Sequence, residues 1–481
     1  MSSSKFSVRI LPIVTVQPTF PTVVNEVYSG VIPSENIWIS CYNNSSSDPP
    51  VPSSSIHSKV RVVLDDEDRE KVVYQVREGD VDILEAERRD FGYIYSVSSP
   101  SLRIPPTRLL FPVQEYADPE KSNPQKPHRI TAFSLAPDKS QYAIGYLDGS
   151  VLLYPSVPIQ NSQRKYPTSA ISGLAPVLTR AHRSTVTSLR FFPSSRVLLS
   201  SGADFTLQVY PADPIAAASV SSASGQSSKR VSSVRTLTAH TRSVTSSAMI
   251  GRGRAIISSS MDGTIRVWDV STGEEETLVH SAAGVGIGIN RIFLDPDRDL
   301  SSSEDAEPST NGRLYAALHD GSFEVFALDG SQKPRKLVHE FRSEESIYGA
   351  LNAIAVSMPI GEAREKLIAV GFAKGVISIY NTSSYASVHF RRNDASIEDL
   401  DFVPLPQSKL GLVITTGDGL PWIASIDELP ITGSVDANVS VYAELVGGDV
   451  DAVRNVSVHT VSSTVEVWTA SDDGIVRRYV L

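Results

Sequence analysis

Cysteine and long apolar segments are scarce in this sequence. Cys41 is the single cysteine among 481 residues, which excludes an internal disulfide and a zinc site built from several thiolates. No apolar run reaches the roughly 20 residues that a membrane-spanning helix needs. The N-terminal run is broken at Pro12 and Pro18 and has no cleavage pattern. We therefore expect a protein of a reducing compartment, the cytoplasm and also the nucleus, with no membrane partner.

Basic residues are also in deficit. The 44 Lys and Arg residues face 54 Asp and Glu residues, for a net charge of −10, whereas nucleic-acid binding needs clustered basic side chains. Residues 393–481 contain 14 acidic and four basic residues, which accounts for the whole net charge. Such a segment is either a solvated surface that keeps the protein soluble or an acidic patch on which a partner docks. No nucleic-acid partner is expected.

What the sequence does contain is an internal repeat. Residues 181–210 and 239–270 each indicate three short strands separated by turns, and the two segments align without a gap through the histidine and the aspartate. In both, a histidine is followed by a serine, an aspartate and an aromatic residue at offsets of 18, 22 and 28 residues: His182, Ser200, Asp204 and Tyr210 in the first, and His240, Ser258, Asp262 and Trp268 in the second.

These residues resemble the WD-repeat family, in which His, Ser or Thr, Asp and Trp form a hydrogen-bonded tetrad within one blade of a propeller. A buried aspartate at a tight turn needs donors, which a histidine ring and a serine hydroxyl supply. We therefore interpret both sets as structural tetrads. The same residue types would permit a nucleophilic triad of His182, Ser200 and Asp204, and we do not favour that interpretation.

Five weaker copies follow from the same pattern of strand, strand, Gly-containing turn and strand. They cover residues 129–156, 289–328, 350–381, 396–426 and 452–481. With the two strong copies they predict an all-β fold, a seven-bladed WD-repeat β-propeller over residues 107–481. The last copy ends on a third strand, so we expect residues 107–116 to close its blade. Residues 1–106 predict a small β-rich N-terminal domain, interrupted by a loop at 43–55.

The loops divide the propeller into two faces. Insertions at 211–233, 295–312 and 358–366 open on one face, so the short loops of the opposite face are the expected docking surface. Acidic residues of the sixth and seventh repeats fall at those short loops. Their positions predict a partner-binding sector of six carboxylates: Asp394, Glu398, Asp418, Asp449, Asp451 and Asp472.

Motifs of catalysis and cofactor binding are missing. The segment 284–290 resembles a dinucleotide fingerprint but lacks a surrounding βαβ unit, and the nine histidines show no paired metal spacing. The acidic run at 65–71 lacks the spacing of a calcium loop. We expect no catalytic residue, no cofactor and no metal.

Residues 181–278 also resemble the proteasomal ATPase-associated factors, which are WD-repeat assembly chaperones of the proteasome regulatory particle. The resemblance rests on the segments FFPS, SSGAD and IGRGR. It implies a non-enzymatic chaperone, monomeric when free, that binds the C-terminal domain of one ATPase subunit of the proteasome base. The alternative is a generic WD-repeat adaptor, such as a ubiquitin-ligase substrate receptor or a histone-binding scaffold.

Overall fold

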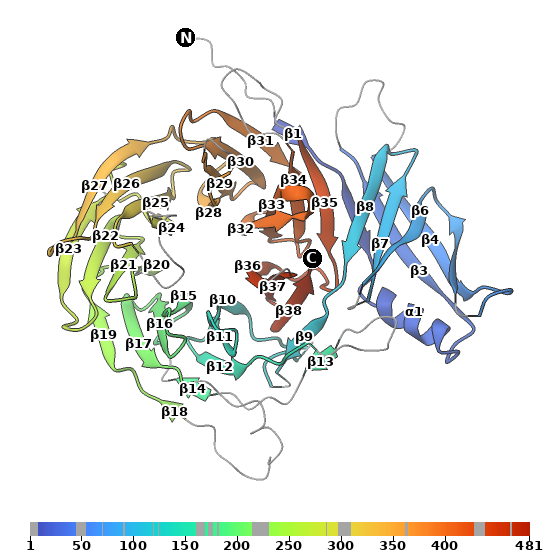
Figure 1. Cartoon of the computed structure of the whole chain (residues 1–481), viewed down its shortest axis with the longest axis horizontal. Helices are drawn as coiled ribbons and strands as arrows, with labels where there is room; N and C mark the ends of the chain where they lie inside the picture. Colours follow the sequence, from blue (N-terminus) through green and yellow to red (C-terminus); the bar gives the residue numbers. More distant parts are fainter. Residues whose placement is uncertain are drawn as a thin grey trace.

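Seven small β-sheets form a closed ring in this computed structural model (Figure 1). The structure describes residues 8–44, 54–69, 71–89, 92–118, 120–123, 125–159, 169–171, 177–179, 182–213, 230–284, 286–296, 309–360, 364–427, 438–461 and 464–481. Among them, no helix is both long and apolar enough to span a membrane. Most of the predicted insertions at 211–233 and 295–312, and the middle of that at 358–366, lie outside the described residues.

The first four blades each contain four antiparallel strands in chain order. Blade one has β10 (Ile130–Leu135), β11 (Gln141–Tyr146), β12 (Val151–Pro155) and β14 (Val177–Thr179). Blade two has β15 (Val186–Phe191), β16 (Val197–Gly202), β17 (Thr206–Pro211) and β19 (Arg235–Thr238). Blade three has β20 (Val244–Ile250), β21 (Ala255–Ser260), β22 (Thr264–Asp269) and β23 (Glu275–His280). Blade four has β24 (Ile289–Pro296), β25 (Gly312–Leu318), β26 (Phe323–Asp329) and β27 (Lys336–Arg342).

The last three blades complete the ring. Blade five has β28 (Leu351–Val356), β29 (Leu367–Phe372), β30 (Val376–Asn381) and β31 (Ser387–Arg391). Blade six has β32 (Ile397–Leu405), a short 3-10 turn η2 (Pro406–Ser408), β33 (Lys409–Thr416), β34 (Trp422–Ile426) and β35 (Val439–Leu445). Blade seven has β36 (Val453–Val461), β37 (Thr464–Ser471), β38 (Ile475–Val480) and, from far upstream, β9 (Gln114–Ala117). The predicted all-β propeller is therefore confirmed.

The second strand of a blade is buried along its whole length in β11, β21 and β29. It has a strand on each side in its own sheet and a neighbouring blade on each face, so it reads as a continuous run of apolar and small residues. The turn after this strand needs a residue with a left-handed backbone conformation, at positive φ. Six blades place a glycine there, for example Gly263 with φ 79, whereas blade two places Phe205 with φ 71.

Each first strand carries a β-bulge at its second residue, and the bulge turns a polar side chain toward the next blade. In blades one to five this side chain donates to a backbone oxygen of the next first strand over 2.5–3.2 Å. The donors are Thr131, Thr187, Thr245, Asn290 and Asn352. In blades six and seven the bulged residues are Glu398 and Arg454, which form an ion pair at 2.8 Å.

The closing strand is β9, which pairs antiparallel with β38 in register Tyr116 to Val476. The predicted segment 107–116 is only half correct, because its first part belongs to β8 (Ile104–Leu110). Pro112 lies between the two strands. The predicted domain boundary at residue 106 consequently falls inside β8.

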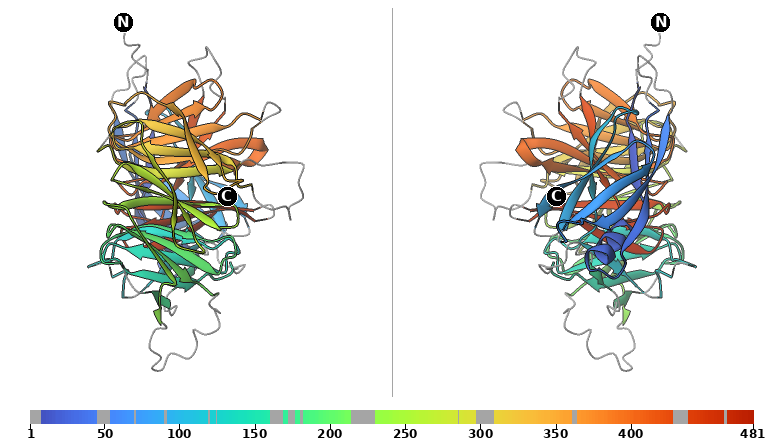
Figure 2. Two further views of the ribbon diagram at one scale, coloured as in Figure 1. Left: turned by 90° about the vertical axis from the view of Figure 1, so that its left-hand side faces the viewer. Right: turned by 90° about the vertical axis from the view of Figure 1, so that its right-hand side faces the viewer.

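The N-terminal region lies at one side of the ring and is built onto it (Figures 1 and 2). One sheet contains β2 (Ile13–Val16), β3 (Ser34–Tyr42), β4 (Ser55–Leu64) and β5 (Val72–Glu78). Strand β7 (Gly92–Ser99) pairs with β6 (Asp82–Arg89) on one side and with β8 on the other, and β8 then runs parallel to β35. Blade six and these strands therefore share one seven-stranded sheet.

A helix that the sequence reading missed packs in this region. Helix α1 (Phe20–Tyr28) has a proline in its first turn and buries Phe20, Val23, Val24 and Val27, the spacing of one helical face. These side chains share a core with Cys41 and Tyr95. The N-terminal region thus contains a helix beside its strands.

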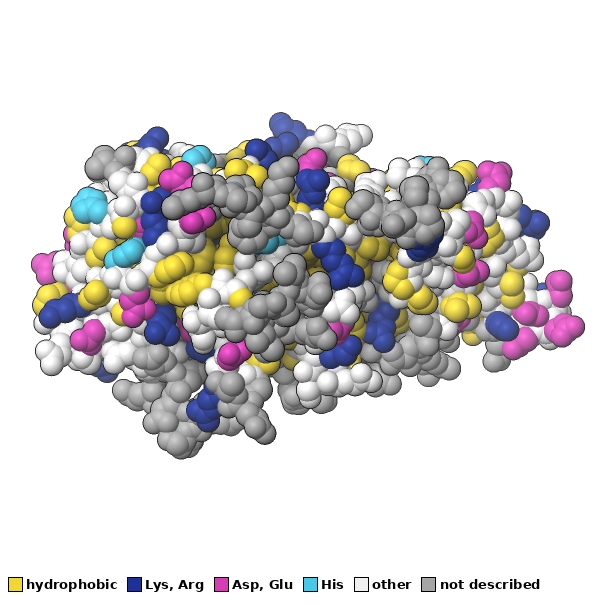
Figure 3. Space-filling model, turned by 90° about the horizontal axis from the view of Figure 1, so that it is seen from above, with side chains coloured by type: hydrophobic (Ala, Val, Ile, Leu, Met, Phe, Trp, Pro, Cys, Tyr) yellow, Lys and Arg dark blue, Asp and Glu magenta, His cyan; other side chains and the backbone are white. Residues whose placement is uncertain are grey.

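Three short parallel strands widen other blades. Strand β1 (Val8–Ile10) lies along β31, β13 (Ser169–Ile171) lies along β9, and β18 (Arg230–Val231) lies along β14. The edges of blades five, seven and one are therefore partly covered by chain from elsewhere in the sequence. In the view of Figure 3, acidic and basic side chains lie scattered among hydrophobic and other side chains.

Candidate functional site

Blade three contains the full hydrogen-bonded tetrad. His240 lies 3.0 Å from Asp262 through Nδ1 and 2.8 Å from Ser258 through Nε2, and the Trp268 indole donates to Ser258 Oγ over 2.8 Å. Burial would raise the pKa of Asp262, but hydrogen bonds from His240, Thr264 and a backbone N–H hold that pKa well below its usual range. The charged carboxylate therefore ties the loop that leads into the blade to its central turn.

Blade two repeats this arrangement with a different aromatic residue. His182 lies 3.0 Å from Asp204 and 2.7 Å from Ser200. The Tyr210 hydroxyl donates to Gln208 over 2.6 Å, so its single proton goes to a neighbour that the sequence reading missed. The order Ser, His, Asp matches that of a nucleophilic triad, but Ser200 is 0% exposed, so a substrate has no access to its hydroxyl.

Three of the six carboxylates predicted to bind a partner form ion pairs, and two of these three share one arginine. The Arg454 guanidinium donates to Glu398 over 2.8 Å and to both oxygens of Asp472 over 3.1 and 2.8 Å. The hydrogen bond with Asp472 is the main cause that raises the pKa of Arg454. Glu398 and Asp472, which the sequence predicted to bind a partner, thus also belong to the junction between blades six and seven.

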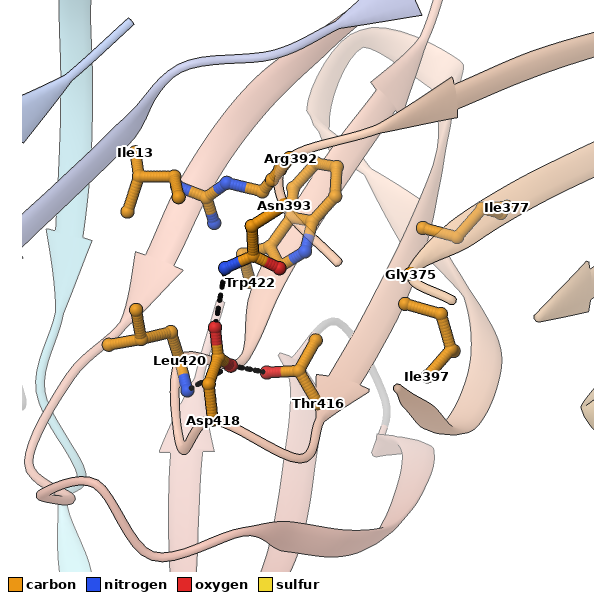
Figure 4. Close-up of a pocket in the computed structure, with 10 residues that line it drawn as sticks. All are labelled: Ile13, Gly375, Ile377, Arg392, Asn393, Ile397, Thr416, Asp418, Leu420 and Trp422. Carbon is orange, nitrogen blue, oxygen red and sulfur yellow. Dashed lines mark hydrogen bonds between the residues drawn. The ribbon is translucent and has the colours of Figure 1, made fainter. Parts of the chain in front are cut away.

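The remaining four of the six carboxylates, of which one is paired, lie on the loop face of blades five to seven. Asp394 is exposed and forms an ion pair with Arg391 at 2.5 Å. Asp418 accepts hydrogen bonds from Asn393 and Thr416, both at 2.6 Å, at the central turn of blade six (Figure 4).

Asp449 and Asp451 lie in the loop between β35 and β36, which runs over the turn at Gly419. Burial raises the pKa of Asp451, and the carboxylates of Asp473, Asp472 and Asp449 raise it further. Within the described ranges, none of Asp418, Asp449 and Asp451 forms an ion pair. We call these three residues the acidic sector.

A second group of charged side chains lies on the innermost strands and was not anticipated. Arg291 on β24 reaches Asp399 on β32 over 2.5 Å and so links blade four to blade six. Asp401 accepts the Val458 N–H over 2.9 Å. Burial, together with the nearby charge of Asp399, raises the pKa of Asp401 to about 7. In the described part of the chain, no cluster of three or more His, Cys, Asp or Glu side chains is arranged to hold a metal ion.

Comparison with known proteins agrees with this geometry. The family described as WD domain, G-beta repeat matches residues 175–210 and 231–269, which contain the two tetrads of blades two and three. The fold and these two repeats support a WD-repeat protein, an all-β propeller of the kind that serves as a protein-interaction scaffold, and no catalytic family is indicated. No curated protein matches the chain.

Proposed function

We propose that this chain is a non-enzymatic assembly chaperone that binds the C-terminal domain of one ATPase subunit of the proteasome base. The observation that carries the proposal is the acidic sector, Asp418, Asp449 and Asp451, which has no ion pair among the described residues and lies on the loop face of blades six and seven. The choice of partner comes from the resemblance of residues 181–278. A basic surface on the ATPase domain would complement these carboxylates and accelerate association.

A charge-reversal titration tests the proposal. The variant Asp449→Lys/Asp451→Lys leaves Glu398 and Asp472 with their arginine, so the blade junction is preserved. The control Asp66→Lys/Glu67→Lys makes the same change of charge at an exposed turn between β4 and β5. We expect the first variant to bind the purified ATPase domain about tenfold or more weakly than the parent, and the control to match the parent.

Ionic strength provides a second readout, because salt screens exposed charges. The affinity of the parent should fall as salt rises, and this dependence should weaken in the Asp449→Lys/Asp451→Lys variant. Equal affinities of the two variants would remove the acidic sector from the function. Binding to a ubiquitin-ligase adaptor or to histones, with no binding to any base ATPase domain, would favour a generic WD-repeat adaptor.

A further inference from the structure

A groove of about 610 Å³ lies between the N-terminal sheet and the loop face of blade six. Its floor is one face of the β2–β3 pair, with Thr15, Trp38, Ser40 and Tyr42. Its opposite wall is formed by Asn393, Asp418, Leu420 and the loop at 448–450. Figure 4 shows the adjoining inner pocket, where Ile13, Asn393, Asp418 and Leu420 line both cavities. The volume falls within the range of about 300–1,000 Å³ that is usual for ligand-binding clefts.

The alternation of β3 explains why this floor carries aromatic side chains. Ile37, Ile39 and Cys41 point into the N-terminal core and are 0% exposed. The intervening Trp38 and Tyr42 point the other way, and Trp38 is 48% exposed. The other three tryptophans of the chain are at most 2% exposed. An exposed tryptophan beside a cleft is typical of a binding site, because its large apolar surface gains most from being covered.

The two ends of the groove differ in charge. Asp418 and Asp449 are the charged residues of the lining, and no Lys, Arg or His lines it within the described residues. At the other end Lys59 lies over the Trp38 ring, 5.7 Å from its centroid. An occupant with a positive charge would therefore be attracted to the propeller wall and repelled from the Trp38 end. The exposed Val450, at 77%, adds apolar surface beside Asp449.

We propose that this groove binds an extended segment of the partner protein, with a lysine or arginine against Asp418 and Asp449 and an apolar side chain against Trp38 and Tyr42. This inference rests on the proposed function, because it assumes that the occupant of the groove is a segment of the partner protein. It adds a specific place and orientation, since the segment would lie across the junction between the N-terminal region and blade six. Neither part alone forms the groove, so both are required for binding.

A labelled peptide with three Lys-Leu repeats is a suitable probe, with a peptide of three Glu-Leu repeats as its charge control. We expect the full chain to bind the Lys-Leu peptide in fluorescence polarisation and not the Glu-Leu peptide. Trp38→Ala and Asp449→Asn should each weaken binding by about tenfold. Bound peptide should also protect the parent from acrylamide quenching, because Trp38 is the exposed tryptophan. The matched control is Phe205→Ala, which removes another exposed aromatic ring on a loop outside the groove.

The outcomes separate the groove from the proposed function. Unchanged peptide affinity in both Trp38→Ala and Asp449→Asn, or equal binding of the two peptides, would overturn the groove. If the ATPase domain binds Trp38→Ala as tightly as the parent but loses affinity for Asp449→Lys/Asp451→Lys, the acidic sector remains and the groove is rejected. If no ATPase domain binds while the Lys-Leu peptide depends on both residues, the groove remains and the proposed partner is rejected.

Discussion

Blades two and three fasten their entry loops with different side chains from those that blades six and seven use. Each blade must fasten the loop that leads into it to its own sheet and to its neighbours. In blade three a histidine-centred hydrogen-bond network does so, with His240 between the charged Asp262 and Ser258. At the junction of blades six and seven the guanidinium of Arg454 does so, between Glu398 and Asp472. The WD family model matches blades two and three, which contain the histidine networks, and does not match blades six and seven.

An arginine–carboxylate pair, and not a histidine network, also joins blade six to the N-terminal region. Arg392 and Glu444 form a doubly hydrogen-bonded ion pair with side chains 5% and 4% exposed. Arg392 also donates to the Pro12 oxygen over 2.9 Å, and Glu444 accepts the Val14 N–H over 3.0 Å. The Trp422 ring lies 4.8 Å from the guanidinium. One buried pair thus joins the β1–β2 connection, the loop after β31 and strand β35.

This comparison teaches that a propeller blade does not depend on its signature residues. The bulge at the second residue of the first strand occurs in all seven blades, whether its side chain is Thr, Asn, Glu or Arg. Backbone geometry is therefore the shared feature, and the polar network varies with the side chains present. Four substitutions test these interactions, two in the networks compared above and two at other positions in the ring.

Glu444→Gln should have the largest effect. It leaves the buried Arg392 charge without its counter-charge, and breaking a buried pair costs about 3–5 kcal/mol. Urea unfolding of the variant should show this loss of unfolding free energy. The control is Asp394→Asn, which breaks the exposed pair with Arg391 and should cost less than about 1 kcal/mol. Similar losses of unfolding free energy in both variants would show that burial does not strengthen the Arg392–Glu444 pair.

Asp262→Ala should destabilise blade three by about 1–3 kcal/mol, since it leaves His240 and the Thr241 N–H without their acceptor. Thermal unfolding measures the loss. Asp320→Ala removes the corresponding aspartate of blade four, which is paired with Arg342 at 2.6 Å instead of with a histidine. Comparable melting points of the parent and Asp262→Ala would count against the tetrad as a stabilising network.

Asp401→Asn should stabilise the protein in a pH-dependent way. The folded pKa of Asp401 is about 7, above its ordinary value of 3.8, so the folded state retains a proton that the unfolded chain releases. The unfolding free energy of the parent therefore falls as pH rises from about 4 to 7. The variant lacks this loss, so its unfolding free energy should exceed that of the parent by up to about 4 kcal/mol at pH 8, with no difference at pH 4. A difference that is constant with pH would refute the assignment.

Phe205→Gly should give the smallest change, a gain of about 0.5–1 kcal/mol. A left-handed backbone costs a bulky residue about 1–2 kcal/mol, and the greater freedom of glycine in the unfolded chain offsets part of the gain. Phe205→Ala keeps the strained conformation and should show no gain, which separates strain from loss of the ring. Differential scanning calorimetry of both variants measures the effect. A lower melting point for Phe205→Gly would show that the ring itself stabilises blade two.

The sequence predicted the ring of blades because the offsets from His182 to Asp204 and from His240 to Asp262 are set within a single blade. It could not predict the junctions. Glu398 and Arg454 are 56 residues apart, so nothing local in the sequence indicates that they pair. Strand β8 was misplaced for the same reason, because its partner β35 is remote in the chain. Helix α1 was missed because its nine residues are rich in valine, a residue that favours strands.

The pairing of β9 with β38 has a consequence for how the protein is made. Glu115 and Arg477, which meet in this sheet, are 362 residues apart. At about 5–20 residues per second, a ribosome needs on the order of tens of seconds to synthesise the intervening chain. For that time the edge of β9 that pairs with β38 has no partner, and the edge of β8 that pairs with β35 waits similarly. Nascent chains on the same messenger could then exchange these strands, so crowded translation should favour domain-swapped dimers unless a holding factor covers the waiting edges.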